Sequence, residues 1–308
     1  DERKTEIQDV EDEIDIEDLI EEEECVYTLT HGGYIKRQPV EVYRTQRRGG
    51  RGISGVARKD EDFVEDMFIT STHDYVLFFT NRGKMYRMKG YEIPETGRAA
   101  RGSHVVNLLP IEKDEKISAM IRVDEVENDS YLVMVTRNGT IKRTALSAYR
   151  NVRKGGIIAI NLEEGDELAW VRNTTGEDDL IIATRQGVAI RFAESDVRPM
   201  GRTAVGVRGI KLREGDYVVG AARAREGKSV LTITERGYGK RTPVEEYRIT
   251  NRGGLGIKNY QVTEKTGKIV GVKVVDGSED LLLVTQSGIL IRIPVDTIKE
   301  TANRATQG

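Results

Sequence analysis

The sequence has few of the residues that mark metal-binding, disulfide-linked or membrane-spanning proteins. Its 308 residues include one cysteine, Cys25, which excludes an internal disulfide and a thiolate metal site. The three histidines, His31, His73 and His104, lie far apart in the sequence. No apolar run approaches the roughly 20 residues of a membrane helix, and no signal-peptide pattern follows Asp1. We therefore expect an intracellular protein that binds neither metal nor membrane.

Proline is also scarce, with 6 residues, whereas glycine reaches 32. Hydrophobic residues make up 38% of the chain and aromatic residues only 6%. This composition suits many short strands joined by tight turns better than long buried helices.

Basic residues are nearly balanced by acidic ones over the whole chain, but the two charges are separated along it. Residues 1–24 hold 14 acidic side chains against Arg3 and Lys4, whereas residues 25–308 hold 46 basic and 37 acidic side chains, a net charge of +9. We interpret residues 1–24 as an acidic leader or linker and residues 25–308 as the folded body. A basic body indicates a polyanionic partner.

The pattern Thr-x-x-Gly-x-x-x-Arg recurs six times, at residues 30–37, 80–87, 136–143, 184–191, 234–241 and 285–292. A strand-like apolar run precedes each Thr, and the Gly falls in a four-residue turn where it can adopt positive φ. Each copy therefore predicts a β-hairpin, and a period of about 50 residues is typical of a propeller.

Two further strands are expected after each hairpin, one beyond a Gly-containing corner and one beyond a second turn. Four strands in each of six units predict an all-β, six-bladed disc over residues 25–308. The sixth unit stops at residues 306–308, where its next strand should begin. Either that strand is truncated or the leader of the first blade completes the ring.

The regular spacing of the Arg is not explained by hairpin construction, because a turn needs no cation. Thr and Gly fit that structural role, whereas an Arg at the same place in every blade would build a ring of positive charge. Basic residues at repeated positions are therefore candidate contacts for a polyanion, namely Lys36, Arg37, Arg44, Arg87, Arg98, Arg101, Lys142, Arg143, Arg150, Arg153, Lys154, Arg191, Arg198, Arg202, Lys240, Arg241, Arg248, Arg252 and Arg292.

The corner after the first hairpin is the richest in arginine. Glycines there let backbone N–H groups and guanidinium groups approach phosphates closely. The fifth unit has a related corner at residues 251–256, so this loop is the normal blade corner with added charge. The motif consists of Gln46, Arg47, Arg48, Gly49, Gly50, Arg51 and Gly52.

This motif resembles the gyrase A box, and the six units around it resemble the C-terminal domain of the A polypeptide of DNA gyrase, a bacterial type II topoisomerase. The resemblance covers residues 25–308, and all seven positions of the box match. It implies a β-pinwheel, in which neighbouring blades exchange strands and the outer rim wraps double-stranded DNA. The paralogous topoisomerase IV protein lacks an intact box.

The same resemblance implies the wider context of the chain. The expected partners are DNA, the rest of the gyrase A polypeptide and the gyrase B polypeptide in an A2B2 assembly, with the isolated domain monomeric. The location would be the bacterial cytoplasm, in association with the nucleoid. This chain would hold no catalytic residue and no cofactor, with ATP and Mg expected elsewhere in the holoenzyme. DNA binding should tolerate any sequence, because no element suited to reading base edges is evident.

Other interpretations remain open. The repeated arginines could merely solvate a protein-interaction propeller, and an enzyme site in a central channel is a third possibility, although the sequence has no recognisable acid–base cluster. Residues 50–55 satisfy G-x-G-x-x-G but do not open a helix, which argues against a dinucleotide site. The leader is either a solvated linker or a competitor of phosphates for the basic rim.

Overall fold

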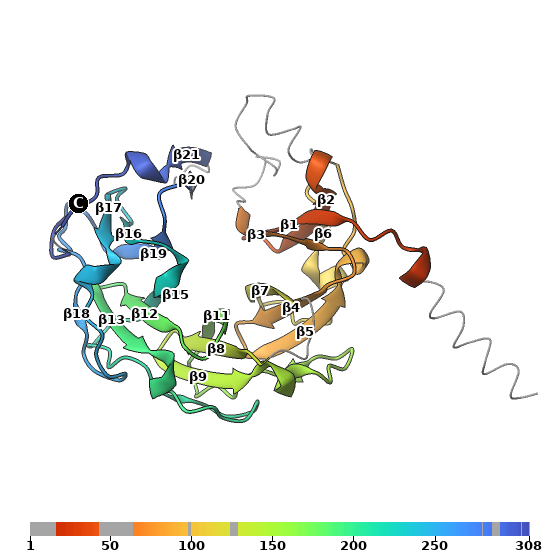
Figure 1. Ribbon diagram of the computed structural model, residues 1–308, viewed down its shortest axis with the longest axis horizontal. Coiled ribbons are helices and arrows are strands. Elements are labelled where there is room, and N and C mark those ends of the chain that lie inside the picture. The colour runs from red at the N-terminus through yellow and green to blue at the C-terminus, as the bar shows by residue number, and fades with distance from the viewer. Residues whose placement is uncertain are drawn as a thin grey trace, which may run out of the picture. The chain divides into compact units, whose positions relative to one another are not determined.

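The computed structural model describes residues 17–42, 64–97, 100–123, 129–278, 280–284, 290–302 and 304–307; in this range the side chains of 64–65, 280–284 and 290–292 are not described. The chain divides into two compact units. The first comprises residues 1–76, 88–108 and 122–124, and the second comprises the rest. Regular structure in the described residues consists mainly of strands joined by turns, with single 3₁₀ turns and short helical segments at residues 17–19 and 40–42 (Figure 1). No described helix is long and apolar enough to cross a membrane.

The first unit contains one antiparallel sheet, with the order β3-β1-β2-β6. Its strands are β1 (Glu24–Thr30), β2 (Tyr34–Pro39), β3 (Val64–Ser71) and β6 (Ser103–His104). The 3₁₀ turns η2 (Gly90–Glu92) and η3 (Val105–Asn107) belong to the same unit. Cys25, Val26 and Tyr27 of β1 are buried, as their continuous apolar run predicts.

The second unit holds the other sheets, with a few end residues of β4, β5 and β7 assigned to the first unit. Three of its sheets have four strands, in the orders β10-β5-β4-β7, β11-β8-β9-β14 and β15-β12-β13-β18. Their strands are β4 (Tyr75–Thr80), β5 (Lys84–Lys89), β7 (Ile117–Val123), β8 (Tyr131–Thr136), β9 (Thr140–Ala145), β10 (Ile157–Ile158), β11 (Leu168–Thr174), β12 (Asp179–Thr184), β13 (Val188–Ala193), β14 (Val207–Arg208), β15 (Val218–Arg223) and β18 (Ile257–Lys258).

The last two sheets have fewer strands among the described residues. One has the order β17-β16-β19, and the other is the hairpin β20-β21. Their strands are β16 (Ser229–Thr234), β17 (Gly239–Pro243), β19 (Ile269–Val275), β20 (Asp280–Val284) and β21 (Leu290–Pro294). The 3₁₀ turns of the second unit are η4 (Leu146–Tyr149), η5 (Glu194–Asp196), η6 (Ala224–Glu226), η7 (Val244–Glu246) and η8 (Val295–Thr297).

The structure confirms an all-β, propeller-like series of four-stranded sheets, but it does not confirm six complete blades. The described residues form four sheets of four strands, one of three and one of two. The shortfall lies in the last two sheets, because no further described strand pairs with β17, β20 or β21.

The Thr and Gly of the first five repeats build the hairpin. In the third copy, Gly139 has a φ of 89° and donates its N–H to the Thr136 carbonyl at 3.0 Å. The N–H of Thr140 donates to the Thr136 hydroxyl at 3.1 Å. The same contact to the hydroxyl recurs at Thr30, Thr184 and Thr234. Buried Thr hydroxyls thus satisfy turn N–H groups that would otherwise lack a partner.

The fourth strand of each complete sheet comes from beyond the next hairpin. Thus β6 pairs with β2, β10 with β5, β14 with β9 and β18 with β13. Each four-stranded sheet therefore cannot form from its own repeat alone. Adjacent repeats share strands, as expected for a pinwheel.

The end of the acidic leader contacts the first unit. The N–H of Glu23 donates to Thr72 Oγ1 at 3.2 Å, and the Thr72 N–H donates to the Glu23 carbonyl at 2.9 Å. Glu17 forms an ion pair with Lys89 at 3.2 Å. These contacts lie beside the expected boundary at residue 25, and β1 begins at Glu24.

Candidate nucleic-acid interface

The repeated Arg holds the turn of the following repeat, a role that sequence analysis did not predict. Arg143 Nε donates to the Val197 carbonyl at 2.7 Å, and Val197 caps η5 of the next repeat. Equivalent bonds join Arg37 to Ile93 at 2.6 Å, Arg241 to Ile298 at 2.9 Å, Arg191 to Tyr247 at 3.2 Å and Arg87 to Arg150 at 3.0 Å. We call Arg37, Arg87, Arg143, Arg191 and Arg241 the clasp arginines.

The position before the clasp arginine is a buried lysine in three copies. Lys142 is fully buried, and its Nζ donates to the Ala159 carbonyl, the Arg202 carbonyl and the Tyr149 hydroxyl. Burial, aided by the nearby Arg202 charge, lowers the pKa of Lys142 to about 7. Lys240 makes similar bonds to the carbonyls of Arg304 and Thr306, and Lys36 donates to Ala100.

These contacts correct the interpretation that the repeated cations form a free ring of charge. Lys36, Lys142, Lys240 and Arg143 are buried, and the other clasp arginines are only partly exposed. These cations are buried because they donate to carbonyl oxygens of the next repeat. One ammonium or guanidinium group can donate to several such acceptors at once. The clasp arginines and the three buried lysines thus serve the strand-exchanged fold by donating to carbonyl oxygens of the next repeat.

The corner segments of the second unit, residues 150–158, 198–208 and 248–258, contact one another in series. Arg252 donates to the carbonyls of Asp196 and Arg208, both at 3.0 Å. Arg202 donates in the same way to the Ile158 carbonyl. Backbone bonds run beside them, such as Gly253 N–H to Gly209 carbonyl at 2.7 Å. The corners 198–208 and 248–258 are therefore held against the fourth strands β10 and β14 of the preceding sheets.

Exposed cations remain on these corners. Arg150, Arg153, Lys154, Arg198 and Arg248 are exposed, in agreement with their expected surface position. Four of them, Arg153, Lys154, Arg198 and Arg248, make no side-chain hydrogen bond or ion pair with a described residue. These side chains are free to bind an anion. Arg101, in the first unit, is partly exposed and its guanidinium lies 4.5 Å from the Tyr34 ring centre.

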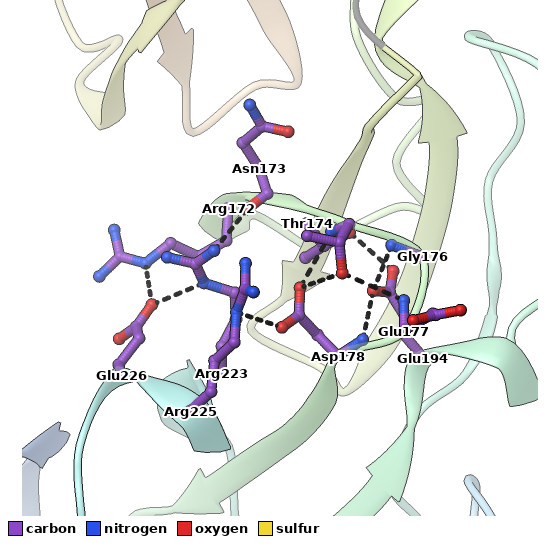
Figure 2. A network of polar contacts seen from close by, with 11 residues as sticks. Arg172, Asn173, Thr174, Gly176, Glu177, Asp178, Glu194, Arg223, Arg225 and Glu226 are labelled. Atoms are coloured by element: carbon purple, nitrogen blue, oxygen red, sulfur yellow. Dashed lines mark hydrogen bonds and ion pairs between the residues drawn. The ribbon is translucent and has the colours of Figure 1, made fainter.

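Three arginines of β11, β15 and η6 have acidic partners. Figure 2 shows Arg172 and Arg223 converging on Glu226, with Nε to Oε1 distances of 3.0 and 3.1 Å. In the same network Arg225 pairs with the buried Asp178 at 2.5 Å. The fully buried Glu194 accepts bonds from Thr174 Oγ1 at 2.6 Å and from the N–H groups of Gly176 and Asp178 at 2.8 Å. These three arginines are paired with carboxylates, whereas Arg153, Lys154, Arg198 and Arg248 on the corners form no ion pair with a described residue.

Sequence analysis missed three exposed cations beside the corners. Arg208 and Lys258 lie on the fourth strands β14 and β18, and Lys211 follows β14. The alternation of half-buried and exposed residues along these strands could have identified the first two, since Val207 and Ile257 face inward. With them, the cationic surface extends from the corners onto the sheet edges.

Several predicted contact residues lie outside the described part of the chain. These are Arg44, Gln46, Arg47, Arg48, Gly49, Gly50, Arg51, Gly52 and Arg98, together with the side chain of Arg292. The repeat pattern aligns these residues with described ones. Gly52, for example, aligns with Gly206 of the fourth corner and Gly256 of the fifth corner. Their assignment to DNA binding stays a prediction.

Exchanged strands, clasped turns and unpaired cations on serial corners define a propeller-like repeat protein with a surface suited to a polyanion. A family model described as DNA gyrase C-terminal domain, beta-propeller, matches residues 26–71, 74–124, 130–175, 178–225, 228–276 and 279–308. The chain belongs to this family. The matched stretches follow the six repeats found in the sequence.

Individual relatives agree with this assignment. The DNA gyrase A polypeptide of Clostridium acetobutylicum is 54% identical over 305 residues, covering 99% of this chain and 37% of that protein. The DNA gyrase A polypeptide of Staphylococcus epidermidis (strain ATCC 12228 / FDA PCI 1200) is 52% identical over 316 residues, covering 100% of this chain and 35% of that protein. The chain thus spans about a third of the length of these relatives.

Solved structures share the fold. The crystal structure of the C-terminal domain of DNA topoisomerase IV is similar with a TM-score of 0.79 and 30% identity, covering 94% of this chain and 89% of that one. The structure of a DNA gyrase A C-terminal domain is similar with a TM-score of 0.73 and 26% identity, covering 92% and 93%.

Proposed function

We propose that this chain binds, bends and wraps double-stranded DNA as the C-terminal domain of a DNA gyrase A polypeptide. In this proposal residues 25–308 form six blades, and DNA follows the corner segments from blade to blade. The observation that carries it is the set of exposed corner cations without acidic partners, Arg153, Lys154, Arg198 and Arg248. The partner that fits an extended series of such groups is a polyanion of regular charge spacing.

The energetic argument favours many contacts over one strong contact. Bending 20 to 30 base pairs by 40° to 90° costs on the order of 1 to 6 kcal/mol. Each phosphate neutralised by Arg or Lys releases counterions, so that affinity accumulates along the corners. Phosphate contacts carry no sequence information, and the proposed binding therefore tolerates any sequence.

The gyrase A box is proposed as the anchor of the wrap. Arg47, Arg48 and Arg51 lie in a corner that, with Arg44, carries four arginines, whereas the fourth corner carries three and every other corner fewer. An anchor at one end of a series of weaker contacts would fix where the wrap begins and give it a defined handedness. In the holoenzyme such a wrap would present a positive crossover for strand passage and so permit negative supercoiling.

The remaining chemistry is proposed to lie outside this chain. The cleaving tyrosine would belong to the rest of the gyrase A polypeptide, and ATP and Mg would act in the gyrase B polypeptide of an A2B2 assembly. This chain would then serve as a non-catalytic DNA guide in the bacterial cytoplasm, associated with the nucleoid.

Ligation of nicked circular DNA in the presence of the chain tests the proposal, because it reports binding, bending and handedness together. We expect the wild-type chain to shift the topoisomer distribution in one direction. Simultaneous replacement of Arg47, Arg48 and Arg51 by Ala should abolish that shift while some binding to linear DNA persists. An unchanged distribution with the triple variant would refute the anchor, and no shift with the wild-type chain would refute wrapping.

A protein-interaction scaffold is the competing function for this fold. It would leave the corner cations as solvated surface, so that DNA affinity would be weak and its dependence on salt shallow. A steep fall in DNA affinity with rising salt, together with DNA compaction, would reject this alternative.

A further inference from the structure

One repeat position determines what lies beneath the corner of the following repeat. This position directly precedes the clasp arginine and holds Lys36, Tyr86, Lys142, Ile190 or Lys240 in successive copies. Each lysine reaches the next corner and donates to one of its carbonyls, at Ala100, Arg202 and Arg304 respectively. The Tyr86 ring lies directly against Gly156, since a Cβ built on that glycine would be 2.6 Å from the ring.

Ile190 is shorter than Lys or Tyr and carries no donor, so it does not fill the same space. A pocket of about 210 Å³ lies here, beneath the fifth corner. Gly254 forms part of its wall, where a Cβ would still be 3.8 Å from the end of the Ile190 side chain. The lining residues are Ala189, Ile190, Arg191, Arg248, Thr250, Asn251, Gly254, Leu255, Gly256 and Ile257.

The lining combines an apolar surface with one available cation. Ile190, Leu255 and Ile257 supply apolar contact, and Leu255 is 49% exposed although it is a large hydrophobic residue. Arg191 is already engaged by the carbonyls of the next turn and by Asp179 at 3.1 Å. Arg248 is exposed and makes no side-chain hydrogen bond or ion pair with a described residue. The charge of the site therefore comes from Arg248.

We propose that this pocket binds a small anion with a compact apolar body, such as an aromatic carboxylate. The apolar body would contact Ile190 and Leu255, and the carboxylate would pair with Arg248. The volume suits a fragment and is below the usual range for drug-sized ligands. For benzoate, with nine non-hydrogen atoms, we expect a Kd on the order of 1 mM.

An NMR titration of the ¹⁵N-labelled chain with benzoate tests the site. Saturable shifts are expected at the amides of Gly254 and Leu255 in the wild-type chain. The neutral analogue benzamide should bind at least about fivefold more weakly, because it cannot pair with Arg248. Equal shifts from benzamide, or no saturable shift at these amides, would overturn the proposal.

Two variants locate the ligand. Ile190→Tyr introduces the residue that the second repeat has at this position. The tyrosine ring should fill the pocket and so abolish the benzoate-induced shifts. Arg248→Gln should weaken benzoate binding about tenfold and leave benzamide binding unaffected. This variant removes the charge without filling the pocket. Arg198→Gln removes the equivalent exposed charge from the fourth corner and should not alter the titration. Shifts that persist in Ile190→Tyr, or that fall equally in Arg198→Gln, would place the binding elsewhere and overturn the proposal.

Discussion

Arg143 Nε donates a 2.7 Å hydrogen bond to the carbonyl oxygen of Val197, which lies 54 residues later in the next repeat. The same guanidinium lies 4.5 Å from the centre of the Tyr131 ring. Since Val197 is fully buried and ends a 3₁₀ turn, this bond fixes the entry to the fourth corner. The clasp couples the stability of one repeat to the position of its neighbour.

Loss of the clasp should destabilise the fold. Arg143→Met leaves the Val197 carbonyl without its charged donor, and we expect the free energy of unfolding to fall by about 1 to 3 kcal/mol. Urea denaturation should show a lower midpoint at an unchanged m value. Arg198→Gln, at an exposed corner position, should stay within about 0.5 kcal/mol of the wild type. Equal effects of the two variants would contradict a structural role for Arg143.

The buried Lys142 predicts a specific pH dependence of stability. Burial and then the Arg202 charge lower its pKa to about 7 from the ordinary value of 10.5. Between these two values the unfolded chain holds a proton that the folded chain has released, so stability rises with pH. Relative to Lys142→Met, the wild-type chain should gain stability above pH 7, with a slope approaching about 1.4 kcal/mol per pH unit, and show no slope below pH 6.

Urea titrations of both chains between pH 5.5 and 9 measure this difference. Burial raises the pKa of Tyr149 well above its ordinary value. An upper limit of pH 9 therefore avoids ionisation of this side chain. Subtraction of the Lys142→Met curve removes contributions from the other titrating groups. A difference that is constant across the whole range would show that Lys142 stays protonated in the folded chain.

The glycine at the end of each corner should tolerate no side chain. Gly206 has a φ of 108°, and an added Cβ would lie 2.5 Å from the Ile141 carbonyl oxygen. We expect Gly206→Ala to cost about 2 to 4 kcal/mol through unfavourable φ and overpacking. Gly201→Ala in the same corner has nothing within 4 Å of the new Cβ and should be neutral or stabilise by up to about 1 kcal/mol. Thermal unfolding of the two variants compares them directly.

Corner cations should dominate the salt dependence of DNA binding if the proposed function is right. The triple variant Arg153→Gln, Arg198→Gln and Arg248→Gln should reduce the slope of log affinity against log salt by about 2 to 3. A matched control replaces three arginines that are paired with Asp114, Glu167 and Glu226, namely Arg82, Arg137 and Arg172. Both variants lose the same charge. An equal change of slope in the control would indicate net charge as the cause and argue against corner contacts.

The sequence by itself determined the repeat, the hairpins and the basic character of the body. These features depend on contacts within a few residues, such as the bond from Thr140 N–H to the Thr136 hydroxyl and the positive φ of Gly139. Spacing and residue type are therefore enough to recognise them. The same local signal indicated that Arg198 and Arg248 would be exposed at the corners.

Only the tertiary structure decided which repeated cations are structural and which are free. Arg143 and Arg198 are both basic residues at repeated positions, yet one is buried against a carbonyl from the next repeat and the other is exposed. The difference arises because neighbouring repeats exchange strands, which brings acceptors from more than 50 residues away onto one cation. A sequence pattern shows the cation but not its distant acceptor. For the same reason it could not predict the pocket beside Ile190, which is formed with residues of the next repeat.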